Sequence, residues 1–211
     1  MLLHLILLVL KIKTMEIIFA SSNVGKIEEI RSVLPSDIKL ISLLDLNFHE
    51  EIPETADTLE GNSLLKAQFA FKKWDKACFS DDSGLEIDFL NGKPGVYSAR
   101  YAGQQRNNDD NMNLVLSEMS QTENRKACFK TVITLIIDGV AHHFEGRVDG
   151  IIRRDKKGTH GFGYDPIFEP EQLGTTFAEM PLEEKSKYSH RKRAIDKMMS
   201  FLEIRKDKSK L

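Results

Sequence analysis

Two adjacent carboxylates, Asp81 and Asp82, occur in the segment S-D-D-S-G-L, which covers residues 80–85 and follows an apolar run. Like charges repel each other, and burying either one costs several kcal/mol unless a cation or hydrogen-bond donors compensate. Neighbouring side chains of a strand point to opposite faces, so the pair can serve one site only if the strand ends there, as Gly84 would allow. The pattern predicts metal binding or proton transfer. An ordinary acidic turn is the alternative.

The segment S-S-N-V-G-K at residues 21–26 follows a predicted strand and opens a predicted helix. Backbone N–H groups at a helix N-terminus attract anions, and Lys26 adds a full positive charge there. The segment is not a P-loop, because Ala20 and Ile27 stand where that motif has a glycine and a serine or threonine. It predicts a phosphate site, and a simply capped helix start is the alternative.

A lysine and an acidic loop precede the aspartate pair. Lys66 lies among apolar residues within a predicted helix, where a surface lysine that reaches solvent is the alternative to a functional one. The loop over residues 49–57 contains Glu50, Glu51 and Glu54, any of which could reach a metal, although a solvated charge run has the same composition. Mg²⁺ prefers one or two carboxylates with phosphate oxygens and water, so one glutamate beside an aspartate would suffice.

The segment G-F-G-Y-D-P at residues 161–166 combines glycines, two aromatic residues and an acid. Aromatic rings such as Phe162 and Tyr164 stack on nucleobases, and Asp165 with loop backbone groups could read a base edge. The alternative is a packed turn whose two rings lie in the core. The pattern therefore predicts a base-binding loop or a structural turn.

A basic segment, E-E-K-S-K-Y-S-H-R, covers residues 183–191. Lys185, His190 and Arg191 could clamp a phosphate or a purine carbonyl. A helix start without a further role is the alternative for this segment.

The elements that must position these residues alternate between strand and helix. Residues 16–20, 26–34 and 38–42 predict a β-α-β opening with parallel strands. Asp138-Gly139 between two strand-like runs predicts a hairpin. Together they predict an α/β fold with a β-rich insertion, which could form two lobes around a cleft. The remaining expected elements are helices over 59–74, 108–119 and 189–204 and strands over 77–80, 126–137, 140–147 and 150–154.

The overall composition excludes some classes of protein. The 211 residues include 30 basic and 32 acidic ones, a net charge of −2. No global field therefore favours nucleic acid or a membrane as a partner. The two cysteines, Cys78 and Cys128, belong to no C-x-x-C motif, which predicts buried thiols and a reducing, cytoplasmic location.

The two ends of the chain are expected to lie outside the fold. Residues 1–14, MLLHLILLVLKIKT, are too short to span a bilayer and lack the flanks of a signal peptide. We expect an extension translated from an upstream start codon, with a weak membrane anchor as the alternative. A single catalytic domain is predicted over residues 15–205, followed by a basic tail over 206–211.

In this order, the motifs closely resemble those of the inosine triphosphate pyrophosphatase family from about Met15 to Leu202. That family hydrolyses deaminated purine nucleoside triphosphates such as ITP, dITP and XTP to the monophosphate and pyrophosphate. The resemblance rests on N-x-G-K at 23–26, S-D-D-S-G-L, P-G-V-Y-S-A-R-Y-A-G at 94–103, G-F-G-Y-D-P-I-F at 161–168, and A-E-M-x-x-x-E-K with S-H-R near the C-terminus. It implies an elongated, two-lobed α/β fold around a central mixed twisted sheet, with an active-site cleft between the lobes.

The resemblance also implies a role for each candidate residue. Asp82 would orient or deprotonate the attacking water and, with Glu54, hold Mg²⁺, Glu51 being the alternative glutamate. Lys66 would support the triphosphate, and Ser83 would contact substrate. A homodimer is implied, with no nucleic-acid or membrane partner. The triphosphate would be held by Ser21, Ser22, Asn23, Val24, Gly25 and Lys26, and the base by Phe162, Gly163, Tyr164, Asp165, Lys185, His190 and Arg191.

The chain departs from the family pattern at one position of the phosphate loop. It has Ser22 where many relatives carry glycine, which could tighten the approach of the backbone to phosphate. A pyrophosphatase for modified pyrimidines and a nucleotide sensor without turnover are the alternative functions. The G-F-G-Y-D-P loop argues against the first, and the aspartate pair with Lys26 argues against the second.

Overall fold

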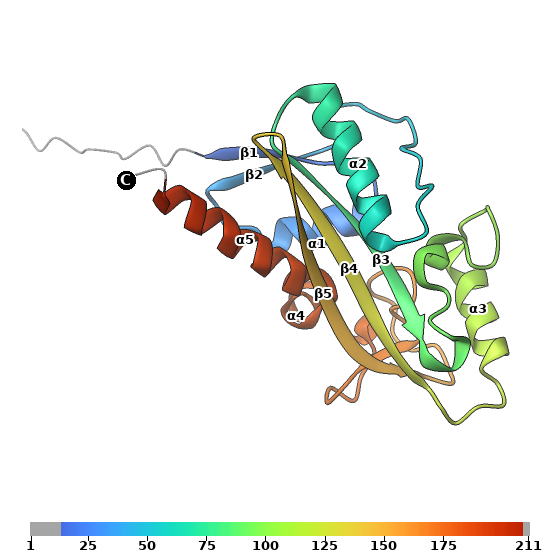
Figure 1. Cartoon of the computed structure of the whole chain (residues 1–211). Helices are drawn as coiled ribbons and strands as arrows, with labels where there is room; N and C mark the ends of the chain where they lie inside the picture. Colours follow the sequence, from blue (N-terminus) through green and yellow to red (C-terminus); the bar gives the residue numbers. More distant parts are fainter. Residues whose placement is uncertain (1–13, 209–211) are drawn as a thin grey trace, which may run out of the picture.

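A curled, mixed β-sheet runs through this computed structural model, which describes residues 14–208 (Figure 1). The strand order is β2-β1-β3-β4-β5-β6, with β2, β1 and β3 parallel and the other neighbouring pairs antiparallel. The sheet is therefore mixed, as predicted. The strands are β1 (Met15–Phe19), β2 (Ile38–Ser42), β3 (Cys78–Ile87), β4 (Lys126–Ile137), β5 (Val140–Ile152) and β6 (Phe168–Pro170).

Side chains that cap the N-termini fix where two of the helices begin. The Asn23 side chain accepts from the Lys26 backbone N–H at the start of α1, and Thr58 accepts from the Gly61 N–H at the start of α2. The helices are α1 (Val24–Val33), α2 (Leu59–Trp74), α3 (Asn108–Glu118), α4 (Leu182–Tyr188) and α5 (His190–Lys208), with 3₁₀ turns η1 (Asp88–Leu90), η2 (Gly95–Arg100) and η3 (Phe177–Glu179).

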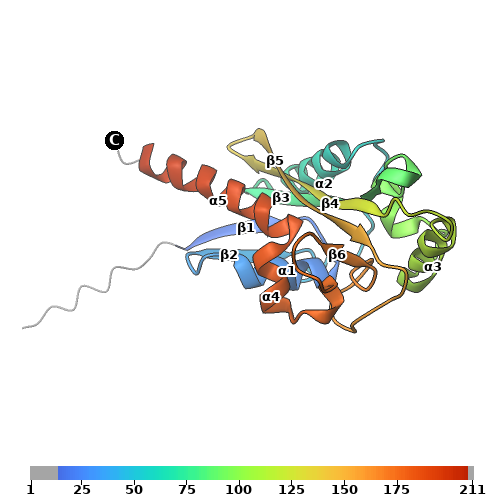
Figure 2. The same ribbon diagram turned by 90° about the horizontal axis from the view of Figure 1, so that it is seen from below.

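Strand alternation divides the helices between the two faces of the sheet. In β1, Ile17 and Phe19 pack in one apolar cluster with residues of α1 and α5, whereas Ile18 packs in another cluster with residues of α2. Accordingly, α2 and α5 lie on opposite sides of the long strands (Figure 1), and α1 and α4 pack beside α5 (Figure 2). The apolar layers on both faces hold the long strands in place.

A third apolar cluster forms around the far halves of β3, β4 and β5. It joins Leu85 and Ile87 of β3 to Met112 and Val115 of α3. Figure 1 shows α3 at the opposite end of the long strands from β1 and β2. The molecule thus has the two lobes expected from the sequence, and the long strands connect them.

The predicted end of the strand at the aspartate pair is wrong. Instead, β3 continues through Ile87 and pairs with β4 along its whole length, Cys78 opposite Ile136 and Ile87 opposite Ala127. Gly84 lies inside the strand, where a Cβ atom would stand 2.5 Å from the Gly95 carbonyl oxygen. This glycine therefore permits a close approach of η2 and does not end the strand.

Other boundaries agree with the sequence or differ from it by local extensions. The helix over 59–74 and the strands over 38–42 and 126–137 are found as predicted. The strands predicted over 140–147 and 150–154 are one strand, β5, because its ladder to β4 is unbroken from Val140 to Ile151. The short α4 and β6 were not predicted.

The predicted chain ends fall largely outside residues 14–208. Of the predicted extension only Thr14 is described, and of the basic tail only residues 206–208, which continue α5 to Lys208. Both cysteines are buried and free, as expected. In the part of the chain that is described, no helix is long and apolar enough to cross a membrane.

Candidate active site

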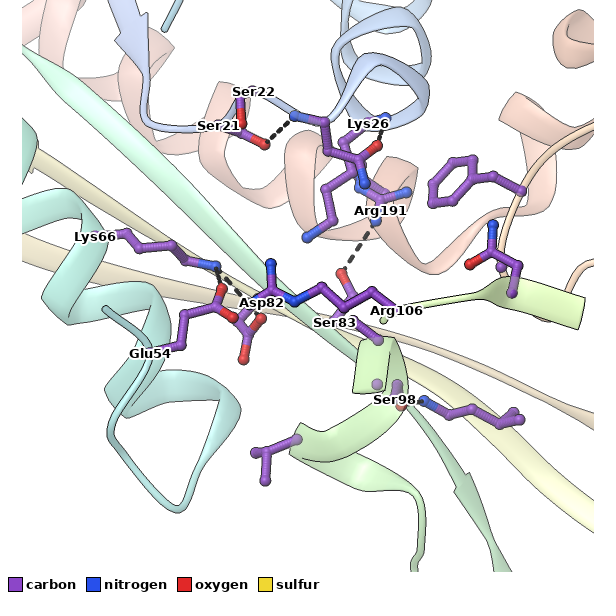
Figure 3. A pocket seen from close by; sticks show the side chains of 18 of the residues that line it. Ser21, Ser22, Lys26, Glu54, Lys66, Asp82, Ser83, Ser98, Arg106 and Arg191 are labelled. Carbon is purple, nitrogen blue, oxygen red and sulfur yellow. Dashed lines mark hydrogen bonds and ion pairs between the residues drawn. The ribbon is translucent and has the colours of Figure 1, made fainter. Parts of the chain in front are cut away.

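A pocket opens along the edge of β3, just beyond the end of β1. The parallel strands β1 and β3 pair only at Ile18–Cys78 and Phe19–Phe79, after which the chain leaves β1 and turns into α1. Among residues 14–208, β3 from Ser80 onward has no strand partner on this side. Ligands of α/β proteins bind at such crevices beyond the carboxyl ends of parallel strands. The pocket lies there, and residues of both lobes line it, such as Leu43 of one and Leu85 of the other. Figure 3 shows it from close by.

Asp82 lies on the α2 side of β3 and meets a lysine and an amide there. Its carboxylate oxygens lie 3.4 Å from Lys66 Nζ and 3.2 Å from Asn62 Nδ2, both in α2. Lys66 Nζ also lies 2.5 Å from Glu54 Oε1, so it stands between the two carboxylates (Figure 3). The acidic loop and the aspartate pair, far apart in sequence, thus converge on one ammonium group.

Asp81 faces the opposite side of β3. Its carboxylate, buried from solvent, accepts from Lys26 Nζ of α1 at 3.0 Å and from Arg191 Nε of α5 at 3.1 Å. Ser83, on the same face, donates to Asp81 and accepts from Arg191 Nη2, each at 3.1 Å. The two neighbouring acids therefore do different work, Asp82 in the pocket and Asp81 as the anchor of two cations behind it.

The surroundings move the pKa values of these two acids in opposite directions. Burial raises the pKa of Asp82 above its usual range, against the opposing effect of Lys66 and Lys26. Burial would raise the pKa of Asp81 as well, but Lys26 and Arg191 outweigh it and hold that pKa well below its usual range. A carboxylate with a raised pKa is the better proton acceptor, so Asp82 is the candidate base of the pair.

The G-F-G-Y-D-P loop forms the other end of the pocket. Phe162 is half-buried, with Lys185 Nζ 4.8 Å from its ring centroid. Asp165 is buried, accepts from the Phe162 backbone N–H at 2.8 Å and lies 2.5 Å from Lys185 Nζ. Tyr164 donates its hydroxyl to the Ser98 carbonyl and packs in the far core cluster, so the packed turn that the sequence left open applies to this ring.

His190 is a buried imidazole in the pocket wall. Its ring stacks on Phe129 with centroids 4.8 Å apart, and within the described residues its Nδ1 atom has no hydrogen-bond partner. Burial, together with the positive charges of Arg191 and Lys185, holds the pKa of His190 well below its usual range. The neutral ring therefore presents an unsatisfied polar atom near the loop residues.

Glu29, which the sequence did not predict, holds two cations of the pocket wall in place from behind. It lies in α1, is 4% exposed, and forms ion pairs with both Lys185 and Arg191. These two cations outweigh the effect of burial and lower the pKa of Glu29. A weak signal was present, because Glu29 follows Lys26 by three residues, about one helical turn, and so lies on the same face of α1 as that lysine.

Most of the residues predicted from the sequence line this one pocket, but three do not. Val24 is 57% exposed and Gly25 packs against the Phe162 ring, so neither reaches the pocket. Asp81 also lies behind its wall. The pocket-lining residues among those predicted are Ser21, Ser22, Asn23, Lys26, Glu50, Glu51, Glu54, Lys66, Asp82, Ser83, Phe162, Gly163, Tyr164, Asp165, Lys185, His190 and Arg191.

The donor set suits a cation that brings other ligands with it. No cluster of three or more His, Cys, Asp or Glu side chains is present within residues 14–208, so a complete protein cage for a metal is absent there. Glu54 and Asp82 nevertheless lie close enough together for Lys66 to form ion pairs with both. Glu51, the alternative glutamate, is 71% exposed and pairs with Arg106 instead. Two carboxylates with room for phosphate and water are what Mg²⁺ uses, so the residues fit this ion.

A model of the Ham1 family matches residues 17–201. This range includes every helix and strand described above except the first two residues of β1 and the last turns of α5. The chain belongs to the Ham1 family. It is 53% identical over 188 residues to a protein of Flavobacterium johnsoniae named dITP/XTP pyrophosphatase, with 89% of this chain and 98% of the relative covered. A Bacillus subtilis protein of the same name is 43% identical over 192 residues, covering 89% and 97% of the two chains.

Solved Ham1 structures share the fold. The Staphylococcus aureus Ham1 protein superposes with a TM-score of 0.80 at 41% identity, covering 89% of this chain and 98% of its own. A HAM1 protein from Coxiella burnetii gives 0.81 at 34% identity, with 90% and 98% covered. The predicted family, fold class and enzyme class, a nucleoside triphosphate pyrophosphatase, are thereby confirmed for this Ham1-family chain.

Proposed function

We propose that this Ham1-family protein hydrolyses the deaminated purine nucleoside triphosphates ITP, dITP and XTP to the nucleoside monophosphate and pyrophosphate, with Mg²⁺ as cofactor. The observation that carries the proposal is the meeting of Asp82, Lys66 and Glu54 in a pocket whose other end is the G-F-G-Y-D-P loop. The names of the relatives support the same activity. The homodimer and the cytoplasmic location remain predictions.

In the proposed reaction, a water molecule attacks the α-phosphorus. Its oxygen forms the new bond to phosphorus, the bond from the α-phosphorus to the oxygen that bridges to the β-phosphate breaks, and pyrophosphate leaves. Asp82 accepts the proton of the water, which its raised pKa favours. Lys26 and Lys66 attract the phosphates, because positioning and charge neutralisation are the main needs of phosphoryl transfer. Mg²⁺ held by Asp82 and Glu54 would neutralise negative charge on the phosphate oxygens.

Preference for a 6-oxo purine follows from the donors at the base end. Lys185 and Arg191 are cations, and the neutral His190 ring can donate from one of its nitrogens. The 6-oxo group of a deaminated purine accepts hydrogen bonds from such donors. The 6-amino group of adenine is itself a donor, so it would leave these protein donors unpaired. Adenine nucleotides should therefore be poor substrates.

A product analysis tests the proposal. The protein is incubated with Mg²⁺ and ITP, dITP, XTP, dATP, dGTP or dUTP in ¹⁸O-enriched water, and the products are separated and weighed by mass spectrometry. We expect monophosphate and pyrophosphate from the first three substrates, with ¹⁸O in the monophosphate. Orthophosphate release, label in pyrophosphate, or turnover of dUTP alone would refute it.

Removal of the proposed metal ligand should raise the Mg²⁺ requirement. We expect Glu54→Gln to increase the Mg²⁺ concentration for half-maximal activity at least about tenfold, because one of two carboxylate ligands is lost. The matched control is Glu60→Gln, which changes an exposed glutamate in the first turn of α2. Thermal stabilisation by Mg²⁺, measured without substrate, gives a second readout. An unchanged Mg²⁺ dependence would exclude Glu54 as a ligand.

A further inference from the structure

Arg106 lies in the pocket although it belongs to none of the motifs that suggested the function. It stands in the loop between η2 and α3, three residues after the P-G-V-Y-S-A-R-Y-A-G segment, in a left-handed backbone conformation with φ 52°. Its guanidinium lies 2.5 Å from Glu51 Oε1 of the acidic loop, on the opposite side of the pocket mouth. A side chain from the second lobe thus reaches across to the first.

Arg106 differs from the other cations of the pocket in how it is paired. Each of the others is mostly buried and meets a carboxylate within the fold, as Lys66 meets Glu54 and Asp82. The Arg106 and Glu51 side chains are 48% and 71% exposed, and ion pairs this exposed contribute little to stability. Arg106 can therefore exchange its partner for an incoming anion at little cost. The other pocket cations are Lys26, Lys66, Lys185 and Arg191.

The Arg106 side chain is directed to the catalytic end of the pocket. It lines the same pocket as Glu54 and Asp82. Figure 3 shows the side chain extending toward Asp82 and Glu54. The base-binding loop at residues 161–166 forms the other end. An anion that meets Arg106 is therefore a phosphate group at the end of the substrate away from the base.

The side chains that line the pocket carry too little net positive charge to balance a triphosphate. Five cationic and five carboxylate side chains line it, so without further help it is close to neutral. A triphosphate is strongly negative, and a cation released from its own carboxylate adds attraction where the phosphates lie. Arginine suits this task because its planar guanidinium binds two phosphate oxygens at once.

We propose that Arg106 binds the two phosphates that leave as pyrophosphate, and that it exchanges Glu51 for them when substrate enters. The inference rests on the proposed function, because it assigns one part of that substrate to one residue. Arg106 is thus a substrate-binding residue contributed by the second lobe.

Direct binding of pyrophosphate tests this role. With Mg²⁺ present, we expect Arg106→Ala to weaken pyrophosphate binding in calorimetry by about 10- to 100-fold, the loss of a charged hydrogen-bonded contact. Inosine monophosphate, which lacks these phosphates, should bind as to the wild type. The KM for ITP should rise with little change in kcat, and Arg106→Lys should restore part of the affinity.

The chain offers a matched control. Arg154 forms a similar exposed pair with Glu123, also at 2.5 Å, but lies outside the pocket, so Arg154→Ala should leave pyrophosphate binding unchanged. Unchanged pyrophosphate affinity in Arg106→Ala, or an equal loss for inosine monophosphate, would overturn the inference. A wild-type protein that releases no pyrophosphate from ITP would instead refute the proposed function. The two failures can be told apart, because calorimetry measures pyrophosphate binding and does not depend on turnover.

Glu51→Gln gives an independent test of the exchange. If Glu51 competes with phosphate for Arg106, its neutralisation should tighten pyrophosphate binding. If Glu51 instead holds Mg²⁺, the same substitution should weaken binding, which would contradict the exchange.

Discussion

Asp82→Asn is expected to lower kcat for ITP by about 10²–10⁴-fold, the usual contribution of a positioned general base. The amide is nearly isosteric, and its oxygen can still accept from either Asn62 or Lys66, so the fold and the pocket should persist. It cannot accept the proton of the attacking water. Nucleotide binding, measured by calorimetry with Mg²⁺, should change far less than kcat.

The control for this variant is Asp149→Asn, which neutralises an exposed aspartate of β5 that pairs with Arg147 on the surface. It should retain the wild-type kcat. Full activity of Asp82→Asn would remove Asp82 from the proton-transfer step. An equal loss of binding and turnover would make Asp82 a binding residue only.

Glu29→Ala is expected to reduce the free energy of unfolding by about 3–5 kcal/mol, because it leaves buried cations without their shared carboxylate. In a chain of this size that corresponds to a melting temperature lower by about 6–20 °C. Chemical denaturation and thermal melting measure the two quantities. Glu28→Ala, one residue away on the exposed side of α1, is the matched control and should have little effect.

The pH dependence of this loss identifies its electrostatic origin. The pKa of Glu29 is lowered in the folded protein, so its stabilising contribution is present above the unfolded-state pKa and disappears as pH falls through the folded-state value. The difference in stability between wild type and Glu29→Gln should therefore be full at neutral pH and shrink below about pH 4. A difference that is constant with pH would point to packing instead.

Much of the fold could be predicted because the signals are local. The α2 helix carries its own N-cap at Thr58 and ends at Asp75 in a left-handed conformation, and the β4–β5 hairpin turns at Asp138-Gly139, both with positive φ. The start of the helix after the S-S-N-V-G-K segment could be predicted for the same reason, since Asn23 caps that helix. Turn and cap chemistry acts over a few residues, and a sequence displays it directly.

The errors arose where partners are distant in sequence. A turn was predicted at Gly84 because glycine is common in turns, but pairing of β3 with β4, some fifty residues away, keeps the strand extended. The sequence predicts the same two alternatives for Phe162 and Tyr164, base stacking or core packing. The structure separates them, because Phe162 is half-exposed and Tyr164 lies in the core. The burial of Glu29 depends on α4 and α5 folding over α1, which no local pattern contains.

The sequence by itself determined the types of most elements and the set of candidate site residues, because capping, turn chemistry and residue identity are properties of short segments. Only the tertiary structure decided which face each of the adjacent aspartates serves. That choice follows from strand alternation once β3 is paired with β4, which sends Asp82 to Lys66 and Asp81 to Lys26 and Arg191. It also brought Arg106 to the pocket, since only packing of one lobe against the other sets that distance.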